Sequence, residues 1–270
     1  MPIDMSQHRA RKRFGQNFLI DESIINQIAG RFLESAQKQY QSKQYRLVEI
    51  GPGRGALTQA LLSQGHPLIA LELDRDLIPI LQTKFSHHRD FELHQGDALK
   101  TDFTVLSKGQ PLRLVGNLPY NVATPLIFKL LDNIEQIIDM HFMLQWEVVA
   151  RLCAGPGDPH YGQLSLIVQN LCKTEALFDV PPSSFSPQPK VQSGFIALTP
   201  REIPLVEQTL QATFEALVKK SFSQRRKTLR NNLKGTLDET QISDAGIDPG
   251  NRAEVLDIES FIKLARLIPG

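Results

Sequence analysis

The chain has 270 residues, 41% of them hydrophobic and 22% charged, and a formal net charge of +1, which is ordinary for a soluble globular protein with one large domain and a small appendage. No apolar run reaches membrane-spanning length and no apolar signal core follows Met1, so we expect a cytoplasmic protein without membrane contacts. The only cysteines, Cys153 and Cys172, have no Cys-x-x-Cys partner, which argues against a zinc site or a disulfide framework.

The first segment with a pattern joins a basic arm to an aromatic and polar turn over residues 8–19. Composition alone fits a solvated tail equally well. A helix is predicted next, because Asp21 or Ser23 can cap it and apolar residues recur on one face from Ile24 to Phe32.

A glycine-rich loop follows the apolar run Leu47–Ile50, which we predict to be a strand. Gly51, Gly53 and Ala56 fit the G-x-G-x-x-G/A pattern, in which small residues let the backbone approach a nucleotide. The pattern is weak alone, and NAD binding or a structural turn are competing interpretations. No Gly-Lys-Ser/Thr follows, which argues against a phosphate-binding P-loop.

Acidic residues follow the next two predicted strands. Glu72 ends the apolar run 68–73, about twenty residues after the loop, where an acid that binds ribose hydroxyls is expected. Asp97 and Ala98 come after the short predicted strand 91–94. The alternatives are a solvated charge at a strand end for Glu72 and an ordinary Gly-Asp turn for Asp97. Acceptors at neighbouring strand ends predict a nucleoside site.

The stretch Gly116–Tyr120 follows another apolar run, which we predict to be a buried parallel strand ending at a crevice. Pro119 pushes Leu118 out of the helical region, so that the Leu118 carbonyl points away from the sheet. The Asn117 amide oxygen supplies a second acceptor. Two acceptors suit a planar amine with two N–H donors, and Tyr120 offers a flat face for the attached ring. A proline turn with an incidental aromatic residue is the alternative.

Alternating helix and strand are predicted to continue up to residue 200. A helix should start with Thr124 as its cap and Pro125 in its first turn. Residues 137–144 should form the next central strand, and residues 164–168 and 194–198 the final strand pair.

Two loops are predicted between these elements. Residues 155–162 contain glycine and proline and form either a mobile lid or a plain surface loop. Four prolines hold Phe185 in a stiff segment, where it either anchors the core or stacks on a ligand.

Beyond Pro200 the alternation ends, so we predict an α/β domain over residues 1–200 and a small helical domain over residues 201–270. Apolar residues from Phe222 to Leu233 predict a helix within a basic run. Seven basic residues and no acidic one lie between Lys219 and Lys234. Such a run favours contact with a phosphate backbone over an ordinary solvated helix face.

These motifs resemble those of known methyltransferases. Residues 116–120 resemble the Asn/Asp-Leu/Pro-Pro-Tyr motif of S-adenosylmethionine-dependent amino-methyltransferases, and residues 49–53 resemble their glycine motif. Residues 11–19, 184–191 and 223–230 are similar to further motifs of the bacterial ribosomal RNA adenine dimethyltransferases that act on the small subunit. The resemblance extends over nearly the whole chain.

The resemblance implies a Rossmann-like S-adenosylmethionine-dependent methyltransferase domain with a small C-terminal all-helical domain. It further implies N6,N6-dimethylation of two adjacent adenosines near the 3′ end of small-subunit ribosomal RNA during biogenesis of the subunit. The expected cofactor is S-adenosylmethionine. The expected partners are the small ribosomal subunit and its RNA, bound by a monomer.

The resemblance also implies roles for particular residues. Residues at the positions of Asn17 and Leu19 contact the cofactor in the family, and the acid at the position of Asp97 accepts from the amino group of the cofactor's adenine. The expected catalytic residues are Asn117, Leu118, Tyr120 and Phe185. The expected cofactor-binding residues are Asn17, Leu19, Gly51, Gly53, Glu72, Asp97, Ala98 and Asn117. The expected RNA-binding residues are Arg11, Lys12, Arg225, Arg226, Lys227 and Arg230, and no metal site is expected.

Three other functions compete with this interpretation. The nearest is dimethylation of adenine in large-subunit RNA, which confers antibiotic resistance. A DNA amino-methyltransferase is disfavoured because the C-terminal region is too small for an elaborate base-reading domain. An assembly or RNA-binding factor that keeps the fold without its chemistry is disfavoured by the intact set of Glu72, Asp97 and residues 117–120.

Overall fold

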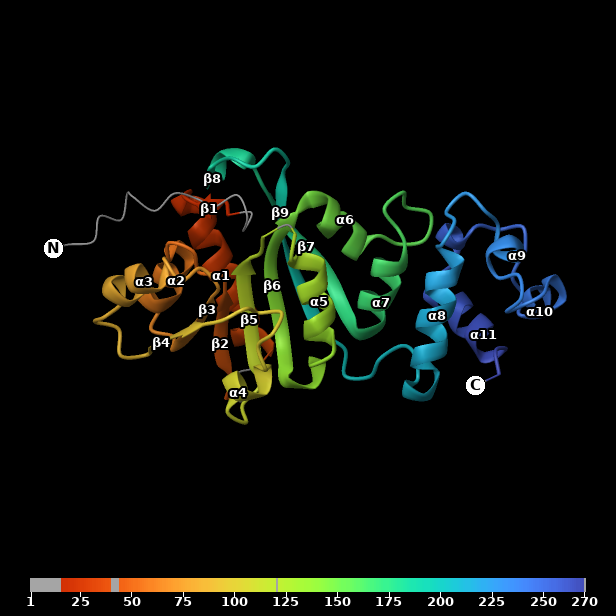
Figure 1. Ribbon diagram of the computed structural model, residues 1–270, viewed down its shortest axis with the longest axis horizontal. Helices are drawn as coiled ribbons and strands as arrows, with labels where there is room; N and C mark the ends of the chain where they lie inside the picture. The colour runs from red at the N-terminus through yellow and green to blue at the C-terminus, as the bar shows by residue number, and fades with distance from the viewer. Residues whose placement is uncertain (1–15, 40–43, 120, 270) are drawn as a thin grey trace. The chain divides into compact units, whose positions relative to one another are not determined.

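The computed structural model of the protein describes residues 16–39, 44–119 and 121–269. The chain divides into two compact units, one of residues 1–146 and 175–200 and the other of residues 147–174 and 201–270 (Figure 1). The sequence alone predicts a division at residue 200. In the structure, residues 147–174 group with the C-terminal helices instead.

The first unit is built on a seven-stranded sheet with the order β4-β3-β2-β5-β6-β9-β7 (Figure 1). Its five strands from β4 to β6 are parallel, and β9 pairs with β6 in the antiparallel direction. Chain order reverses at β2, which lies between β3 and β5, and ligands of open α/β sheets bind at such a switch point. The strands are β2 Arg46–Ile50, β3 Leu68–Glu72, β4 Phe91–Gln95, β5 Leu112–Asn117, β6 Ile137–Gln145, β7 Cys172–Val180 and β9 Ser193–Pro200.

The predicted strands from β2 to β6 and β9 are confirmed. Five α-helices connect and cover them: α1 Glu22–Gln39, α2 Ala56–Ser63, α3 Ile78–Lys84, α4 Phe103–Ser107 and α5 Ala123–Leu131.

Asp21, rather than Ser23, caps α1, because its Oδ1 accepts from the backbone N–H groups of Ser23 and Ile24 at 3.0 and 3.3 Å. Burial of Ile28 and Phe32 confirms the predicted apolar face of this helix.

A small ribbon joins the N-terminal segment to the segment that follows β7. Strands β1 Phe18–Leu19 and β8 Phe185–Ser186 pair in the antiparallel direction, with Leu19 opposite Phe185. Both side chains belong to the hydrophobic core of the first unit. The ribbon therefore holds residues 17–19 against the body of the unit.

A buried ion pair joins β5 and β6 to α1. Arg113 is fully buried and lies opposite Asp139 in the sheet register. Its Nε and Nη2 donate to the two carboxylate oxygens of Asp139, each at 2.8 Å. Nη2 also donates to the Phe32 carbonyl and the Ser35 hydroxyl, each at 2.6 Å. Burial lowers the pKa of the neighbouring His141 to about 4, although the Asp139 charge opposes this shift.

Two sequence predictions of local structure before residue 200 are wrong. Residues 164–168 lie in a helix, α7 Gln163–Leu171, and β7 is the neighbour of β9 in the sheet. A short apolar run fits a buried helix and a buried strand equally well, and here the Ser165 hydroxyl accepts from the Gly162 N–H at 3.1 Å, as at a helix start. Helix α5 begins one residue before Thr124, so Thr124 is not its cap.

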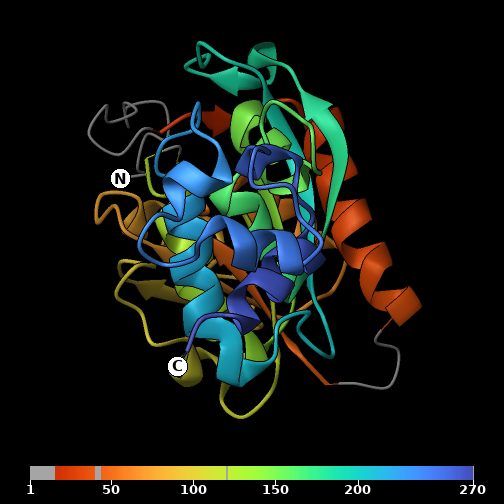
Figure 2. The ribbon, with the colours of Figure 1, turned by 90° about the vertical axis from the view of Figure 1, so that its right-hand side faces the viewer.

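Beyond Pro200, the described residues of the second unit form helices and loops but no strand. Phe214 of α8 and Phe261 of α11 are fully buried in its hydrophobic core, and these two helices lie side by side (Figure 2). In the basic run α8 ends at Ser221 and only the short α9 follows, so the helix predicted over Phe222 to Leu233 is largely wrong. The helices are α6 Trp146–Cys153, α7 Gln163–Leu171, α8 Gln211–Ser221, α9 Leu229–Asn232, α10 Glu239–Asp244 and α11 Ile258–Arg266.

Short 3-10 helices complete the described structure at Ile134–Gln136, Pro182–Ser184, Gln208–Leu210 and Ala253–Val255. Within the part of the chain that the structure describes, no helix has the length and apolarity needed to cross a membrane.

Candidate active site

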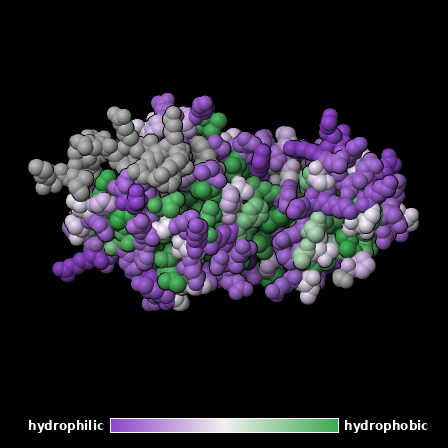
Figure 3. All heavy atoms as spheres, viewed as in Figure 1, coloured by the Kyte–Doolittle hydropathy of each residue, from purple (hydrophilic) through white to green (hydrophobic). Residues whose placement is uncertain are grey.

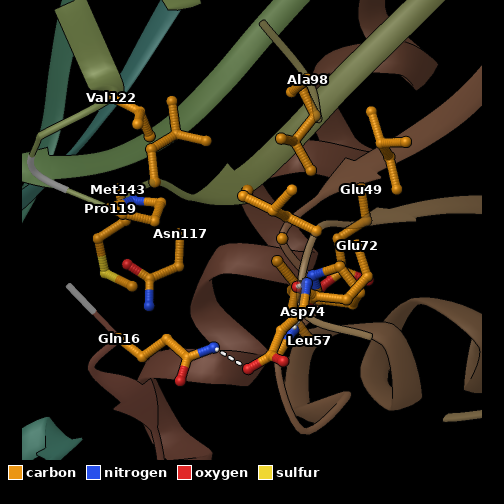
Figure 4. Close-up of a pocket in the computed structure, with 18 of the residues that line it drawn as sticks. Gln16, Glu49, Leu57, Glu72, Asp74, Ala98, Asn117, Pro119, Val122 and Met143 are labelled. Carbon is orange, nitrogen blue, oxygen red and sulfur yellow. Dashed lines mark hydrogen bonds between the residues drawn. The ribbon is translucent and has the colours of Figure 1, made fainter. Parts of the chain in front are cut away.

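A pocket in the first unit opens at the carboxyl ends of β2, β3 and β5. Figure 4 shows Glu72 and Asp74 on one side of it and Asn117 and Met143 on the other. Every residue predicted to bind the cofactor lines this pocket, as does Leu118. The strand ends singled out in the sequence thus meet in one cavity.

The glycine loop between β2 and α2 needs its glycines for two reasons. Gly51 and Gly53 have φ values of +70° and +58°, which side chains disfavour. A Cβ atom on Gly53 would lie 3.0 Å from the Phe18 ring, which is closer than an ordinary contact, whereas one on Gly51 would lie at an ordinary 3.9 Å from the Asn117 carbonyl. Gly51 is therefore favoured by its φ value alone, and Gly53 also keeps space open between the loop and the N-terminal segment.

Glu72 connects this loop to the end of β3. Its side chain is buried, and its Oε2 accepts from the Gly53 N–H at 3.1 Å while its Oε1 accepts from the Asp74 N–H at 2.8 Å. Burial raises the pKa of the Glu72 carboxyl, and the backbone N–H groups of Asp74 and Gly53 oppose this shift. Each carboxylate oxygen has a second lone pair, with which it can accept from a ligand hydroxyl.

Glu49 forms a second acid at the pocket, which the sequence analysis did not single out. It lies in β2 with 2% of its surface exposed, and its Oε2 accepts from the Thr58 hydroxyl at 2.6 Å. Burial raises the pKa of Glu49 to about 7, with the Glu72 charge adding to the shift and Thr58 and Lys84 opposing it. Its signal in the sequence was an acid inside the otherwise apolar run 47–50.

Asp74 is another residue that the sequence analysis missed. Its Oδ2 accepts from Gln16 Nε2 at 3.0 Å, as the dashed line in Figure 4 shows. The carboxylate is buried, with 1% of the residue exposed. This bond holds the first described residue of the chain against the end of β3. The sequence feature that could have pointed to Asp74 is its place two positions after Glu72.

The side chain of Asn117 is oriented by the N-terminal segment. Its Nδ2 donates to the Asn17 carbonyl at 2.9 Å, so the amide oxygen faces the other way. The Leu118 N–H donates to the Met143 carbonyl at 3.1 Å, which ties the turn to β6. Among the described residues, no hydrogen bond uses Asn117 Oδ1 or the Leu118 carbonyl as acceptor. Both predicted acceptors are therefore available to a ligand.

Gly116 sets the distance between β5 and β2 next to this turn. A Cβ atom here would lie 2.4 Å from the Ile50 carbonyl oxygen, a backbone atom that cannot swing away. Any side chain would push the end of β5, and with it Asn117, away from the glycine loop. A glycine inside a strand pattern signals such a close approach of two backbones.

The family of the chain follows from sequence comparison. The sequence model of the family described as "Ribosomal RNA adenine dimethylase" matches residues 7–269. The chain belongs to this family. A Pseudomonas putida protein named "Ribosomal RNA small subunit methyltransferase A" is 51% identical over 260 residues, which cover 96% of this chain and 95% of the relative. A Methylococcus capsulatus protein of the same name is 50% identical and covers 96% of this chain and 98% of its own length.

Solved structures share the fold of this dimethylase family member. A dimethyladenosine transferase from Plasmodium falciparum is 27% identical, with a TM-score of 0.73 over 92% of this chain and 95% of that one. The "23S rRNA methyltransferase ErmE" is 24% identical, with a TM-score of 0.74 over 93% of this chain and 99% of that one, and shows likeness of fold. As a family member with the Rossmann-like α/β fold, the chain is a ribosomal RNA methyltransferase, and both facts imply S-adenosylmethionine as its methyl donor.

Asp97 and Phe185, two further residues predicted for the site of this dimethylase family member, differ in how accessible they are to a ligand. Asp97 Oδ1 accepts from the Leu99 N–H at 2.9 Å, which leaves the second carboxylate oxygen for a ligand. Phe185 is 2% exposed in the core, as the core-anchor interpretation expects, so its ring would have to be uncovered before it could stack on a base. Tyr120, Arg11 and Lys12 lie outside the described residues.

The predicted basic run has acidic partners in space that the sequence did not reveal. Arg225 Nε lies 3.2 Å from Glu254 Oε2, and Arg230 Nη1 lies 3.7 Å from Glu239 Oε2. Arg226 and Lys227 are exposed and have no ion pair within the described residues. In Figure 3 hydrophilic residues cover much of the visible surface of the second unit. The uncompensated charge is therefore smaller than the sequence indicated.

Arg225 also takes part in holding the loop of residues 155–162 within the second unit. Its Nη2 donates to the Pro159 carbonyl. The Gly157 N–H donates to the Glu254 carbonyl at 2.8 Å, and the Tyr161 hydroxyl donates to the Leu256 carbonyl at 2.9 Å. These three hydrogen bonds hold residues 155–162 as a surface loop on the second unit.

Proposed function

We propose that this enzyme transfers methyl groups from S-adenosylmethionine to N6 of two adjacent adenosines near the 3′ end of small-subunit ribosomal RNA, until each base is dimethylated. It would act as a monomer on the small ribosomal subunit during its biogenesis. The observation that carries the proposal is the single pocket that joins the glycine loop, Glu72 and Asp97 to the Asn117 turn. The names of relatives about half identical to this chain support the small subunit as substrate.

The residues of the pocket fit the proposed methyl donor. The space left by Gly53 admits the nucleoside, and the buried Glu72 carboxylate would accept from its ribose hydroxyls. Asp97 would accept from the adenine amino group, with Asn17, Leu19 and Ala98 as further contacts. When bound, S-adenosylmethionine supplies a methyl group that its positively charged sulfur already activates.

The Asn117 turn would bind and orient the target amine. An adenine amino group is weakly nucleophilic because its lone pair is shared with the ring. Acceptance of its two hydrogens by Asn117 Oδ1 and the Leu118 carbonyl would favour a pyramidal nitrogen and direct its lone pair at the methyl group. The bond from Asn117 Nδ2 to the Asn17 carbonyl supports this role, because it turns the oxygen, and not the nitrogen, toward the ligand.

No general base is assigned in this mechanism. Positioning contributes up to about 7–11 kcal/mol of barrier reduction, whereas base catalysis typically contributes roughly 3–5 kcal/mol. Within the described pocket, Glu49, Glu72 and Asp74 accept hydrogen bonds from the protein itself. The proton is proposed to leave to water after methyl transfer.

The target base must leave its stack to enter the pocket, at a cost of a few kcal/mol. Stacking on Tyr120 would offset part of this cost, at about 1–3 kcal/mol per base. Phe185 would contribute to stacking on the target base only after its own ring is uncovered.

Labelled S-adenosylmethionine tests the substrate most directly. We expect label in small-subunit RNA or small subunits, recovered as N6,N6-dimethyladenosine after nuclease digestion and chromatography. Large-subunit RNA and DNA serve as controls and should stay unlabelled. Label in either control at the same rate would contradict the proposed substrate, and a product that stops at one methyl group would contradict dimethylation.

Charge removal tests the proposed RNA contact. We expect the double variant Arg226→Gln, Lys227→Gln to bind RNA more weakly and to flatten the slope of log affinity against log salt by about 1.4–1.8, because each lost phosphate contact removes about 0.7–0.9. Both side chains are exposed, so the fold should be unaffected. The variant Lys173→Gln, Lys263→Gln loses the same charge elsewhere in the second unit and should keep the wild-type slope. Equal slopes in all three proteins would exclude the contact.

A further inference from the structure

Trp146 is an exposed aromatic residue that directly follows β6, the strand whose Met143 lines the pocket. It is the only tryptophan of the chain and leaves 40% of its surface exposed. Scattered exposed apolar residues such as Val105 and Ile203 are normal on protein surfaces. A flat indole ring beside a pocket that receives a nucleic-acid base is a different case, because such rings serve as stacking platforms.

The sheet register places Trp146 near the Asn117 turn. Asn117 lies opposite Met143 in the β5–β6 pair, and both line the pocket. Trp146 follows Met143 by three residues, or about 10 Å along an extended strand. Both acceptors for the target amine lie at the same end of the sheet. Trp146 is therefore within reach of a nucleotide next to the one in the pocket.

A neighbouring segment adds a positive charge at this position. The backbone N–H of Trp146 donates to the Gln192 carbonyl at 3.0 Å, which brings the backbone of residues 190–192 alongside. Lys190 is exposed, and Val191 is 45% exposed. A ring, an apolar side chain and a cation together suit a nucleotide, since the base can stack while the ammonium group attracts its phosphate.

We propose that Trp146 is a stacking platform for an RNA base adjacent to the target adenosine. The proposal rests on the proposed function, because it needs the target base to lie at the Asn117 turn. Stacking on an unpaired neighbour would hold the strand open while the target is extruded. Since every base has an aromatic face, the platform would contribute to RNA affinity with little dependence on base identity.

Tryptophan emission reports directly on this contact. Because the chain has one tryptophan, the whole signal comes from position 146. We expect saturating small-subunit RNA, or a short single-stranded oligoadenylate, to quench the emission and to protect the ring from acrylamide. The enzyme should be saturated with S-adenosylhomocysteine so that the pocket is filled in every titration.

Substitutions separate the aromatic face from the bulk of the side chain. We expect Trp146→Ala and Trp146→Leu to weaken RNA binding roughly 5- to 150-fold. Trp146→Phe should restore most of the affinity because it keeps a flat ring. Val105→Ala removes an exposed apolar side chain from α4, at the opposite end of the sheet in Figure 1, and should bind like the wild type. Unchanged S-adenosylhomocysteine affinity would show that the variants are folded.

The outcomes distinguish this proposal from the proposed function. RNA that binds and is methylated without quenching Trp146, with Trp146→Ala binding as tightly as wild type, would overturn the platform and leave the function intact. Quenching by proteins of the small subunit, but not by RNA, would assign the surface around Trp146 to a protein partner. That result would also overturn the proposed platform. A wild-type enzyme that neither binds nor methylates RNA would refute the proposed function and the platform with it.

Discussion

Replacement of Asn117 by alanine is expected to lower the single-turnover rate of methyl transfer by about 100- to 1,000-fold, the range seen when one preorganised hydrogen-bonding group is removed from an active site. The variant loses the acceptor that would orient the target amine. It should fold and still bind S-adenosylmethionine, because Glu72 and the glycine loop remain. The measurement is product formation with enzyme in excess over RNA, alongside cofactor affinity at equilibrium.

Asn117→Asp is the matched control for this prediction. Aspartate keeps an acceptor oxygen at the position but loses the donor to the Asn17 carbonyl. We expect it to be slower than wild type and faster than Asn117→Ala. Wild-type rates in the alanine variant would refute the role of Asn117, and equal losses in both variants would show that the bond to Asn17, rather than the acceptor oxygen, is what matters.

Replacement of Asp139 by alanine is expected to lower the free energy of unfolding by about 3–5 kcal/mol. The fully buried Arg113 would lose the carboxylate that accepts two of its hydrogen bonds, while its charge stays out of water. Denaturant unfolding followed by circular dichroism measures the change. The effect should extend to the site, because Arg113 lies four residues before Asn117 in β5.

Removal of both charges tests whether burial of an unpaired ion is the cause. In Arg113→Met, Asp139→Leu no charge remains, and apolar side chains of similar size fill the space. We expect this double variant to be more stable than Asp139→Ala. A double variant as unstable as the single one, or a loss below about 1 kcal/mol in Asp139→Ala, would contradict the explanation.

Strands β2, β3 and β5 of the central sheet could be predicted from the sequence because each is a short, largely apolar run that ends at a glycine or an acidic residue. The same reasoning failed at residues 164–168, where an apolar run of similar length is a helix. Nothing in five residues of sequence separates the two structures. The difference comes from the surrounding fold, which seats this run in the core of the second unit.

The candidate site was predictable where chemistry follows a strand end directly, as at Gly51, Glu72, Asp97 and Asn117. Contacts between distant segments were not predictable. The Asn17 carbonyl that orients Asn117 is one hundred positions away in sequence. Likewise, the Glu254 carboxylate that pairs with Arg225 lies outside the basic run, so counting charges along the chain overstated what RNA would meet.

Phe185 shows how a correct motif can leave its function open. The sequence placed this aromatic residue in a stiff loop, and both stacking on a ligand and anchoring the core fitted that position. The structure pairs it with Leu19 in the β1–β8 ribbon and covers its ring. Burial of a side chain depends on a partner strand that the local sequence does not reveal.

Glu49 links this fold to solution pH. Its pKa of about 7 in the folded protein exceeds the ordinary value of 4.5, so the folded chain holds a proton that the unfolded chain has released between these two pH values. The contribution of Glu49 to stability is therefore complete in acid and declines as the solution approaches neutrality. A melting experiment in acetate buffer would consequently overstate the stability of the folded chain at neutral pH.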